Sequence, residues 1–248
     1  PNRNHCDSVL IIGTNSLLDE ILTELNGHAL SRTMVKLVSS FSADQIAIDD
    51  PHLFPKLDLV IQKGNTVSRP LLTEMIHSDF DCIFVLADDS DGGDADARSI
   101  MTILMLGDII NHCKDRRIPR VVLELKDSRN RDLVKDSIAS EIVVSSNLVS
   151  IVMAQISQYP VVGPVYRELL SAGGIQISLR TPDHYNLLNQ RVMHSDLIAM
   201  GLEEFETVVG IIVSRPTGIE VVLSPDTSQA WMLDSGDRII VLSQQLYN

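Results

Sequence analysis

The sequence predicts an α/β fold in which a parallel sheet is followed by a smaller region of mixed α and β structure. Short apolar runs alternate with helix-length amphipathic segments through roughly the first 145 residues, which is typical of βαβ units. The run Ser8–Gly13 ends on a glycine that leads into helix-like sequence. After residue 175, two β-branched runs flank a short turn, which indicates a hairpin. The fold should therefore be Rossmann-like in its first part and α+β in its second.

In the first part, each predicted strand is a short apolar run bounded by polar or turn residues. The six strands are Ser8–Gly13, Met34–Ser39, Leu57–Gln62, Cys82–Ala87, Val121–Lys126 and Glu141–Val144. Apolar spacing predicts a helix over Ser16–Leu25, with Gly27 ending it. Pro70 fits the first turn of a helix, and a long helix with a wide apolar face should cover Asp96–Cys113.

In the second part, an apolar helix over Asn147–Tyr159 should start at a cap formed by Ser146 and Asn147. Pro160 and the pair Gly163-Pro164 should break it. The remaining expected elements are a helix over Val165–Leu170, a strand over Ile175–Arg180, a hairpin turning at Arg215–Gly218 and a last strand over Asp237–Ser243. We therefore expect a Rossmann-like lobe over 1–145, crossover helices and a hinge over 146–174, and a small α+β lobe over 175–248.

Composition narrows the class of protein. A net charge of −13 argues against binding to a nucleic-acid backbone, which needs clustered Lys and Arg. The three cysteines are widely spaced and form no C-x-x-C pair, so we expect a reducing, cytosolic setting. Apolar runs fall short of the ~18 residues that a membrane span needs. The first residues contain neither an initiator Met nor a signal peptide, which suggests a fragment of a longer protein.

The first candidate site is a nucleotide site at the carboxyl edge of the predicted sheet, where such ligands rest. Its expected residues follow three strands: Gly13, Thr14, Asn15, Ser16, Gly64, Asn65 and Asp88. Gly13 allows a tight turn, but the second and third glycine positions of the G-x-G-x-x-G fingerprint hold Asn15 and Leu18. The second strand ends in serines instead of the usual ribose-binding acid. NAD or another nucleotide is one interpretation, and a turn that only shapes the fold is the other.

The second candidate site is an acidic loop after the fourth strand, and its carboxylates are Asp88, Asp89, Asp91, Asp94 and Asp96. Hard cations such as Ca²⁺ take six to eight oxygen ligands, and Gly92 and Gly93 would let the loop curl around an ion. Binding would order the loop, which makes a switch. The alternative is a solvated acidic loop in which Asp96 caps the next helix and Arg98 pairs with a carboxylate.

No catalytic set emerges from the sequence. The histidines lack metal-binding spacing, and the serines around Ser146 lack a G-x-S-x-G elbow. We therefore predict that the chain is not an enzyme.

The ending Leu233-x-x-Gly236-Asp237, followed by the strand Ile239–Leu242, resembles the RCK domains that regulate potassium channels and transporters. Three longer segments, "DADARSIMTILMLGDII", "LKDSRNRDLV" and "SEIVVSSNLVSIVMAQIS", are more specifically similar to the CASTOR and POLLUX family of ion channels. The resemblance implies a gating-ring module at the cytoplasmic face of a membrane, whose copies assemble below a pore. It also favours the Ca²⁺ interpretation of the acidic loop.

We accordingly expect a ligand-sensing regulatory module of a potassium- or calcium-conducting channel, with self-association into dimers and a ring and a pore domain in the same chain. Ca²⁺ or a nucleotide would be the ligand. Two alternatives stay open: an NAD-dependent Rossmann oxidoreductase, and a separate regulatory subunit of a potassium uptake transporter. Pore helices upstream would distinguish the channel from the separate subunit.

Overall fold

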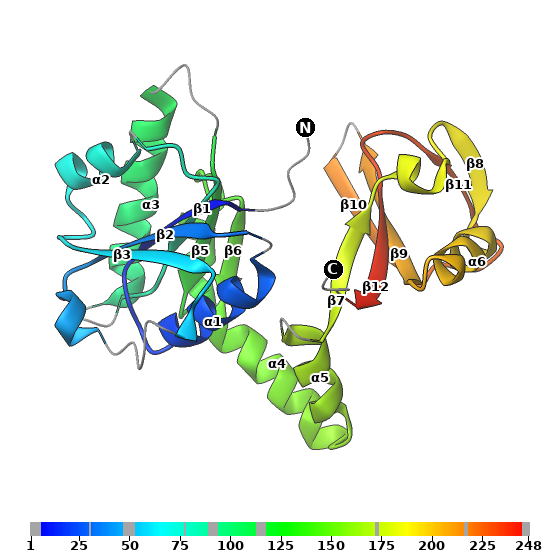
Figure 1. The fold of residues 1–248 in the computed structure, drawn as a ribbon, viewed down its shortest axis with the longest axis horizontal. Helices are drawn as coiled ribbons and strands as arrows, with labels where there is room; N and C mark the ends of the chain where they lie inside the picture. The colour runs from blue at the N-terminus through cyan, green and yellow to red at the C-terminus, as the bar shows by residue number, and fades with distance from the viewer. Residues whose placement is uncertain are drawn as a thin grey trace. The chain divides into compact units, whose positions relative to one another are not determined.

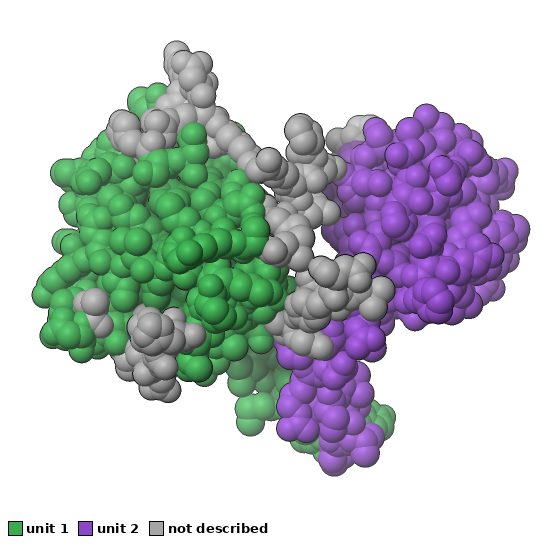
Figure 2. Space-filling model, in the orientation of Figure 1, with its two compact units in different colours: residues 1–159 green, residues 160–248 purple. Residues whose placement is uncertain are grey.

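The computed structural model describes residues 6–29, 31–46, 53–76, 78–88, 94–112, 118–171, 174–215 and 218–244 (Figure 1). The chain divides into two compact units, residues 1–159 and residues 160–248 (Figure 2). The boundary lies between two helices, within the stretch 146–174 that we expected to connect two lobes.

The first unit is built on a six-stranded sheet in which every neighbouring pair is parallel. The strands are β1 (Ser8–Ile12), β2 (Thr33–Ser39), β3 (Leu57–Lys63), β4 (Cys82–Val85), β5 (Arg120–Leu125) and β6 (Glu141–Val144). Their order is β3-β2-β1-β4-β5-β6, so the direction of chain progression reverses between β1 and β4. This is the strand order of the Rossmann fold, and all six predicted strands are confirmed.

Helices cover both faces of this sheet, because successive strand residues point to opposite sides. Leu10 and Ile12 of β1 pack with α2 (Arg69–Ile76) and α3 (Ala95–His112). Val9 and Ile11 point the other way and pack with α1 (Leu18–His28). The central strands β1, β4 and β5 are mostly buried on both faces, which explains why they are continuous apolar runs.

The predicted end of one helix and the predicted cap of another are wrong. α1 passes through Gly27 and ends at His28, because Gly27 keeps a helical conformation instead of the left-handed one that would terminate the helix. The proposed cap of the crossover helix also fails. α4 (Ser145–Gln158) begins two residues before the predicted start at Asn147, with Val144 at its N-cap, and the Ser146 hydroxyl donates to the carbonyl of Lys126 at 2.5 Å.

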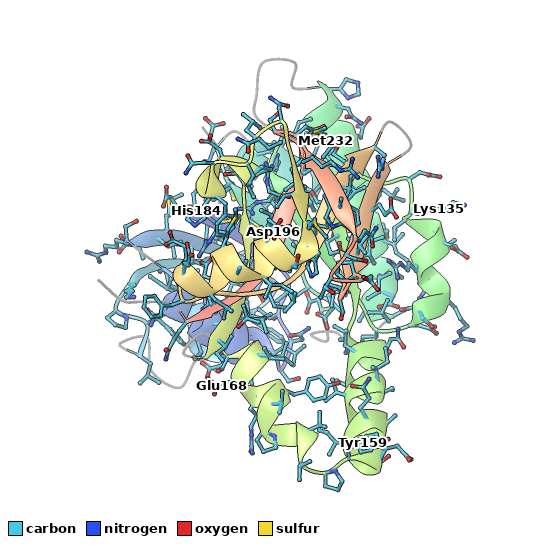
Figure 3. All side chains as sticks on the ribbon, turned by 90° about the vertical axis from the view of Figure 1, so that its right-hand side faces the viewer. Lys135, Tyr159, Glu168, His184, Asp196 and Met232 are labelled. Carbon is cyan, nitrogen blue, oxygen red and sulfur yellow. The ribbon has the colours of Figure 1, made fainter. Side chains whose placement is uncertain are left out.

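α4 has no buried residue, although it is one of the more apolar helices of the chain. Leu148, Ile151 and Met153 are 55%, 48% and 66% exposed. Tyr159, which follows the helix, is also exposed (Figure 3). The apolar pattern therefore predicted the helix, and not its burial within the chain.

The second unit is built on an antiparallel sheet of order β10-β9-β12-β7, with a two-stranded ribbon β11-β8 beside it. Its elements are α5 (Val162–Leu170), β7 (Ile175–Arg180), β8 (Gln190–Met193), α6 (His194–Glu203), β9 (Thr207–Arg215), β10 (Gly218–Leu223), β11 (Ala230–Leu233) and β12 (Arg238–Gln244). The predicted hairpin is confirmed by the pairing of Arg215 with Gly218. Gly163 and Pro164 start α5 instead of preceding it, since a proline is tolerated in a first turn. The described residues also form short 3-10 helices in both units, namely η1 (Ala43–Gln45), η3 (Ser128–Leu133) and η4 (Pro182–Tyr185).

Buried polar groups fix the second unit. Asp237 is 1% exposed, and its carboxylate accepts from the backbone N–H of Ser214 at 2.9 Å and of Asp234 at 2.8 Å. The Gly-Asp turn that we identified before the last strand therefore joins β12 to β9. Glu206 accepts from Tyr185 Oη at 2.6 Å and pairs with Arg180.

Candidate functional site

The carboxyl edge of the parallel sheet is where an open α/β fold binds its ligands, at the point where strand order reverses. Here that point lies between β1 and β4. Gly13 follows β1 with φ of +92°, a conformation that favours glycine. A Cβ at Gly13 would lie 2.8 Å from the carbonyl oxygen of Leu86, so this position also needs glycine for space. The predicted tight turn after the first strand is present.

The Asn15 side chain spans the crevice between β1 and β4. Its Nδ2 donates to the carbonyl of Ala87 at 3.1 Å and to Glu124 Oε2 at 2.7 Å. Its Oδ1 accepts from the backbone N–H of Leu17 at 3.0 Å, at the start of α1. In a dinucleotide site this position is glycine so that the pyrophosphate can approach the backbone. In this chain the Asn15 side chain lies at that position. It accepts the hydrogen bond of the Leu17 N–H group, which would otherwise face an anion.

Glu124 is the member of this network that sequence reasoning missed. It lies on β5, is 7% exposed, and its Oε2 also accepts from the backbone N–H of Ala87 at 3.1 Å. A single acid within the otherwise apolar run Val121–Leu125 was the available signal. A buried carboxylate beside the crevice disfavours an anionic ligand there, because like charges repel strongly away from water.

The other predicted nucleotide residues lie at the same edge but bond to the protein itself. Thr14 Oγ1 is 3.2 Å from Ser39 Oγ, and Ser39 in turn accepts from the backbone N–H of Phe41. Gly64 donates its N–H to the carbonyl of Ser39 at 2.7 Å, and Asn65 Oδ1 accepts from Val67 N–H at 3.0 Å. Gly64 and Asn65 follow β3, which is two strands removed from β1. Ser16 is exposed at the start of α1.

The five predicted cation residues lie in different surroundings. Asp89 and Asp91 lie outside the described residues. Asp88 is 3% exposed and lies just after β4. Its side chain is close to Gly13, because a Cβ added to Gly13 would lie 3.3 Å from the Cβ of Asp88. Asp94 caps α3: its Oδ1 accepts from the backbone N–H groups of Asp96 at 3.1 Å and Ala97 at 3.3 Å.

Asp96 has a different role from the helix cap that we considered for it. It is 3% exposed, and its Oδ1 accepts from Lys126 N–H at 2.7 Å. Its Oδ2 accepts from Asp127 N–H at 2.9 Å and from Asn130 Nδ2 at 2.7 Å. The carboxylate therefore joins the start of α3 to the segment after β5. Asp127 caps η3 through Arg129 N–H, and hydrogen bonds from Arg129 lower the pKa of Asp127 to about 2.

Within the described part of the chain, no three His, Cys, Asp or Glu side chains are grouped so that they could hold a metal ion. None of its helices is long and apolar enough to cross a membrane.

No family model matches the chain. A probable POLLUX ion channel of Oryza sativa subsp. japonica is 26% identical over 221 residues, covering 76% of the chain. A probable POLLUX channel of Arabidopsis thaliana is 28% identical over the same length and coverage. The aligned region makes up 22% and 26% of these two relatives, so the chain matches about a quarter of their length.

Among solved structures, the human SLO3 gating ring superposes over 98% of the chain with a TM-score of 0.68 and 14% sequence identity, and the match covers 48% of that structure. At this identity the likeness concerns the fold. Together with the strand order, the exposed connecting helix α4 and the buried Gly-Asp turn, it places the chain in a known architecture. The chain is therefore similar in sequence to the CASTOR and POLLUX ion channels and similar in fold to a gating ring of the RCK type.

Proposed function

We propose that this chain is a cytosolic, ligand-sensing regulatory module of an ion channel that conducts potassium or calcium. The observation that carries the proposal is the similarity to POLLUX channels over 221 residues. Regulation would work by linkage: a ligand that binds one arrangement of the two units better than another shifts the assembly toward it, by no more than its difference in affinity. The pore would lie in the same polypeptide, and the module at the cytoplasmic face of the membrane.

Self-association is supported by exposed apolar side chains on two helices. α4 presents Leu148, Ile151 and Met153, and α3 presents Met101 and Leu104, which are 53% and 54% exposed. Large exposed apolar patches mark interaction sites more often than they mark free surface. Copies of this module would pair through these helices and build a ring below the pore.

The proposed ligand is Ca²⁺, bound by the loop that follows β4. Asp88, Asp89, Asp91 and Asp94 would supply the oxygen ligands, whereas the contacts of Asp96 assign it to the protein scaffold. A nucleotide is the weaker proposal, because Asn15 fills the crevice and the Glu124 carboxylate lies beside it. The same two residues count against an NAD-dependent oxidoreductase. A separate transporter subunit would use the same module without an attached pore.

The test is thermal denaturation of the protein with Ca²⁺, Mg²⁺, NAD⁺, NADH, ATP or ADP, since a ligand specific to the folded state raises the midpoint by mass action. We expect a rise with Ca²⁺ that the double variant Asp89→Asn/Asp91→Asn abolishes. The control Glu203→Asn/Glu204→Asn removes the same charge from exposed positions in the second unit. A Ca²⁺ shift that persists in the Asp89/Asp91 variant contradicts this site, and a large NADH shift supports the nucleotide instead.

A further inference from the structure

Two cysteines and an arginine meet at the amino edge of the parallel sheet, opposite to the crevice. Cys6 precedes β1, Cys82 begins β4, and Arg120 begins β5 beside it, in register with Cys82. The Cys6 and Cys82 side chains interact closely enough for each to shift the pKa of the other. Arg120 Nη2 donates to Cys6 Sγ at 2.8 Å. Both thiols are free, and their proximity does not follow from their spacing in the sequence.

Asp81 holds the chain around Cys6 in place. Its Oδ2 accepts from the backbone N–H of Asp7 at 3.0 Å, and from the N–H and Oγ of Ser8 at 3.1 and 3.2 Å. Asp81 also donates its own N–H to the carbonyl of Ser8. The segment directly after Cys6 is therefore attached to the segment directly before Cys82. This attachment holds the start of β1 beside the start of β4 without a covalent bond.

The two thiols are chemically unequal. The hydrogen bond from Cys82 and the charge and hydrogen bond of Arg120 lower the pKa of Cys6 to about 6, although burial and the Asp81 carboxylate oppose this shift. The hydrogen bond with Cys6 and burial raise the pKa of Cys82. Cys6 is partly exposed, whereas Cys82 is 5% exposed. A thiolate that solvent reaches, beside a protonated buried thiol, is the arrangement of a reactive cysteine and its resolving partner.

We propose that Cys6 and Cys82 form a peroxide-sensitive thiol pair, in which Cys6 is the nucleophile and Cys82 resolves it. The Cys6 thiolate attacks one oxygen of a hydroperoxide, the O–O bond breaks, and Cys6 becomes a sulfenic acid while hydroxide or alkoxide leaves with the electron pair. Cys82 sulfur then attacks Cys6 sulfur, the S–O bond breaks, and the Cys82 proton leaves with the hydroxyl group as water. Two thiols and one hydroperoxide thus give a disulfide, water and an alcohol or a second water. A dithiol reductant restores the starting state.

Oxidation of Cys6 also prepares the second step. The Cys6 thiolate is the first cause of the raised Cys82 pKa, and it no longer exists once Cys6 is a sulfenic acid. The resulting disulfide would attach the chain before β1 covalently to β4, adding to the attachment that Asp81 makes through hydrogen bonds. The module would then respond to redox conditions independently of the ligand at the opposite edge.

The experiment uses the chain with Cys113→Ser, which removes its third thiol. After treatment with hydrogen peroxide and digestion without reductant, mass spectrometry should find the Cys6 and Cys82 peptides linked, with the loss of two hydrogen atoms. In Cys82→Ser, Cys6 should be trapped by dimedone as the sulfenic acid, whereas in Cys6→Ser the buried Cys82 should stay unmodified. Circular dichroism confirms that each variant is folded. Absence of the linked peptide, or dimedone on Cys82 instead of Cys6, overturns the proposal.

Alkylation of Cys6 by iodoacetamide as a function of pH gives a second readout that a merely structural thiol would not show. At pH 6 the parent should react about tenfold faster than a model cysteine peptide, since its larger thiolate fraction outweighs its lower nucleophilicity. Cys82→Ser keeps a hydrogen-bond donor and should keep most of this rate, whereas Cys82→Ala and Arg120→Gln should lose it. Arg120→Lys, which keeps the charge, should lose less than Arg120→Gln. Equal rates in all variants overturn the assignment of Cys6 as the nucleophile.

Discussion

At the scale of single residues, Asn15 and Glu124 bond to each other at the point where strand order reverses, between β1 and β4. Glu124 is buried, and its Oε2 accepts from the Asn15 amide and the Ala87 N–H. A buried carboxylate that loses a donor costs free energy, because no water replaces the lost hydrogen bond. The pair therefore contributes to stability at the place where Rossmann folds usually hold a ligand.

Replacing Asn15 tests this contribution. We expect Asn15→Ala to lower the free energy of unfolding by about 1–3 kcal/mol, since it leaves Glu124 with fewer donors. Asn15→Asp should cost more, because it places a second carboxylate against Glu124, and adding Glu124→Gln should recover part of the loss. Urea denaturation measures each value. If Asn15→Ala and the parent unfold at the same urea concentration, the network does not stabilise the fold.

His194 gives the second unit a pH dependence. It is 3% exposed at the start of α6, its Nδ1 has no hydrogen-bond partner among the described residues, and burial lowers its pKa. Above the pKa of the unfolded chain, about 6.5, the residue is neutral in both states and has no effect. Below it, the unfolded chain takes up a proton that the folded chain resists, so stability falls as the pH falls.

We therefore expect the unfolding free energy to decrease between pH 7 and pH 5.5, by at most about 1.4 kcal/mol per pH unit from this group. His194→Gln should remove that part of the pH dependence. His184→Gln, at an exposed position in the same unit, should leave it in place. Chemical denaturation at several pH values, followed by a signal from the second unit, compares the three proteins.

At the scale of elements, Asp96 joins α3 to the segment that follows β5. Its two oxygens accept three hydrogen bonds from Lys126, Asp127 and Asn130. These contacts connect two of the segments that carry the resemblance to CASTOR and POLLUX channels, one containing Asp96 and the other beginning at Leu125.

Asp96→Ala should lower the unfolding free energy by about 2–4 kcal/mol, because it leaves three N–H donors buried or partly buried without their acceptor. Asp94→Ala removes an equal charge two residues away but only a helix cap, and should cost about 1 kcal/mol. Thermal or urea denaturation measures both variants. Equal losses in the two would mean that the Asp96 contacts do not hold α3 to the sheet.

Except for β8, β11 and α6 of the second unit, the sequence was sufficient to predict the strands and helices, because burial makes parallel strands apolar and amphipathic spacing marks helices. It also indicated the Gly13 turn, since few other residues adopt that backbone conformation. It did not indicate the partners of Asn15 and Asp96. Asn15 and Glu124 are 109 positions apart, and Asp96 and Lys126 are 30 apart, so only the strand order brings them together. Pairing between distant polar side chains is a property of the tertiary fold, and local pattern does not encode it.

At the scale of the whole molecule, the exposed apolar side chains of α4 predict assembly. Because this helix buries none of its residues within the chain, water remains in contact with a surface that another copy would cover. The double variant Leu148→Ser/Ile151→Ser should therefore shift the protein toward the monomer in sedimentation experiments, with little loss of thermal stability.

A matched control for this prediction is Leu133→Ser, at an apolar position in η3 that is 65% exposed. It should leave the mass in solution unchanged. If the α4 variant and the control have the same mass as the parent at every concentration, self-association does not use α4.

The Asn15 side chain would compete with any ligand that came to the edge of the sheet between β1 and β4. A ligand that came between β1 and β4 would first have to displace the Asn15 amide, which is always present because it belongs to the same chain. The ligand would also have to replace the hydrogen bond that Asn15 donates to Glu124. A metal cation could coordinate the Glu124 carboxylate and an amide-bearing group could donate to it, whereas an ionised phosphate offers it neither a positive charge nor a donor. Selectivity at this edge of the sheet would then depend on what the protein has placed there itself, before any ligand arrives.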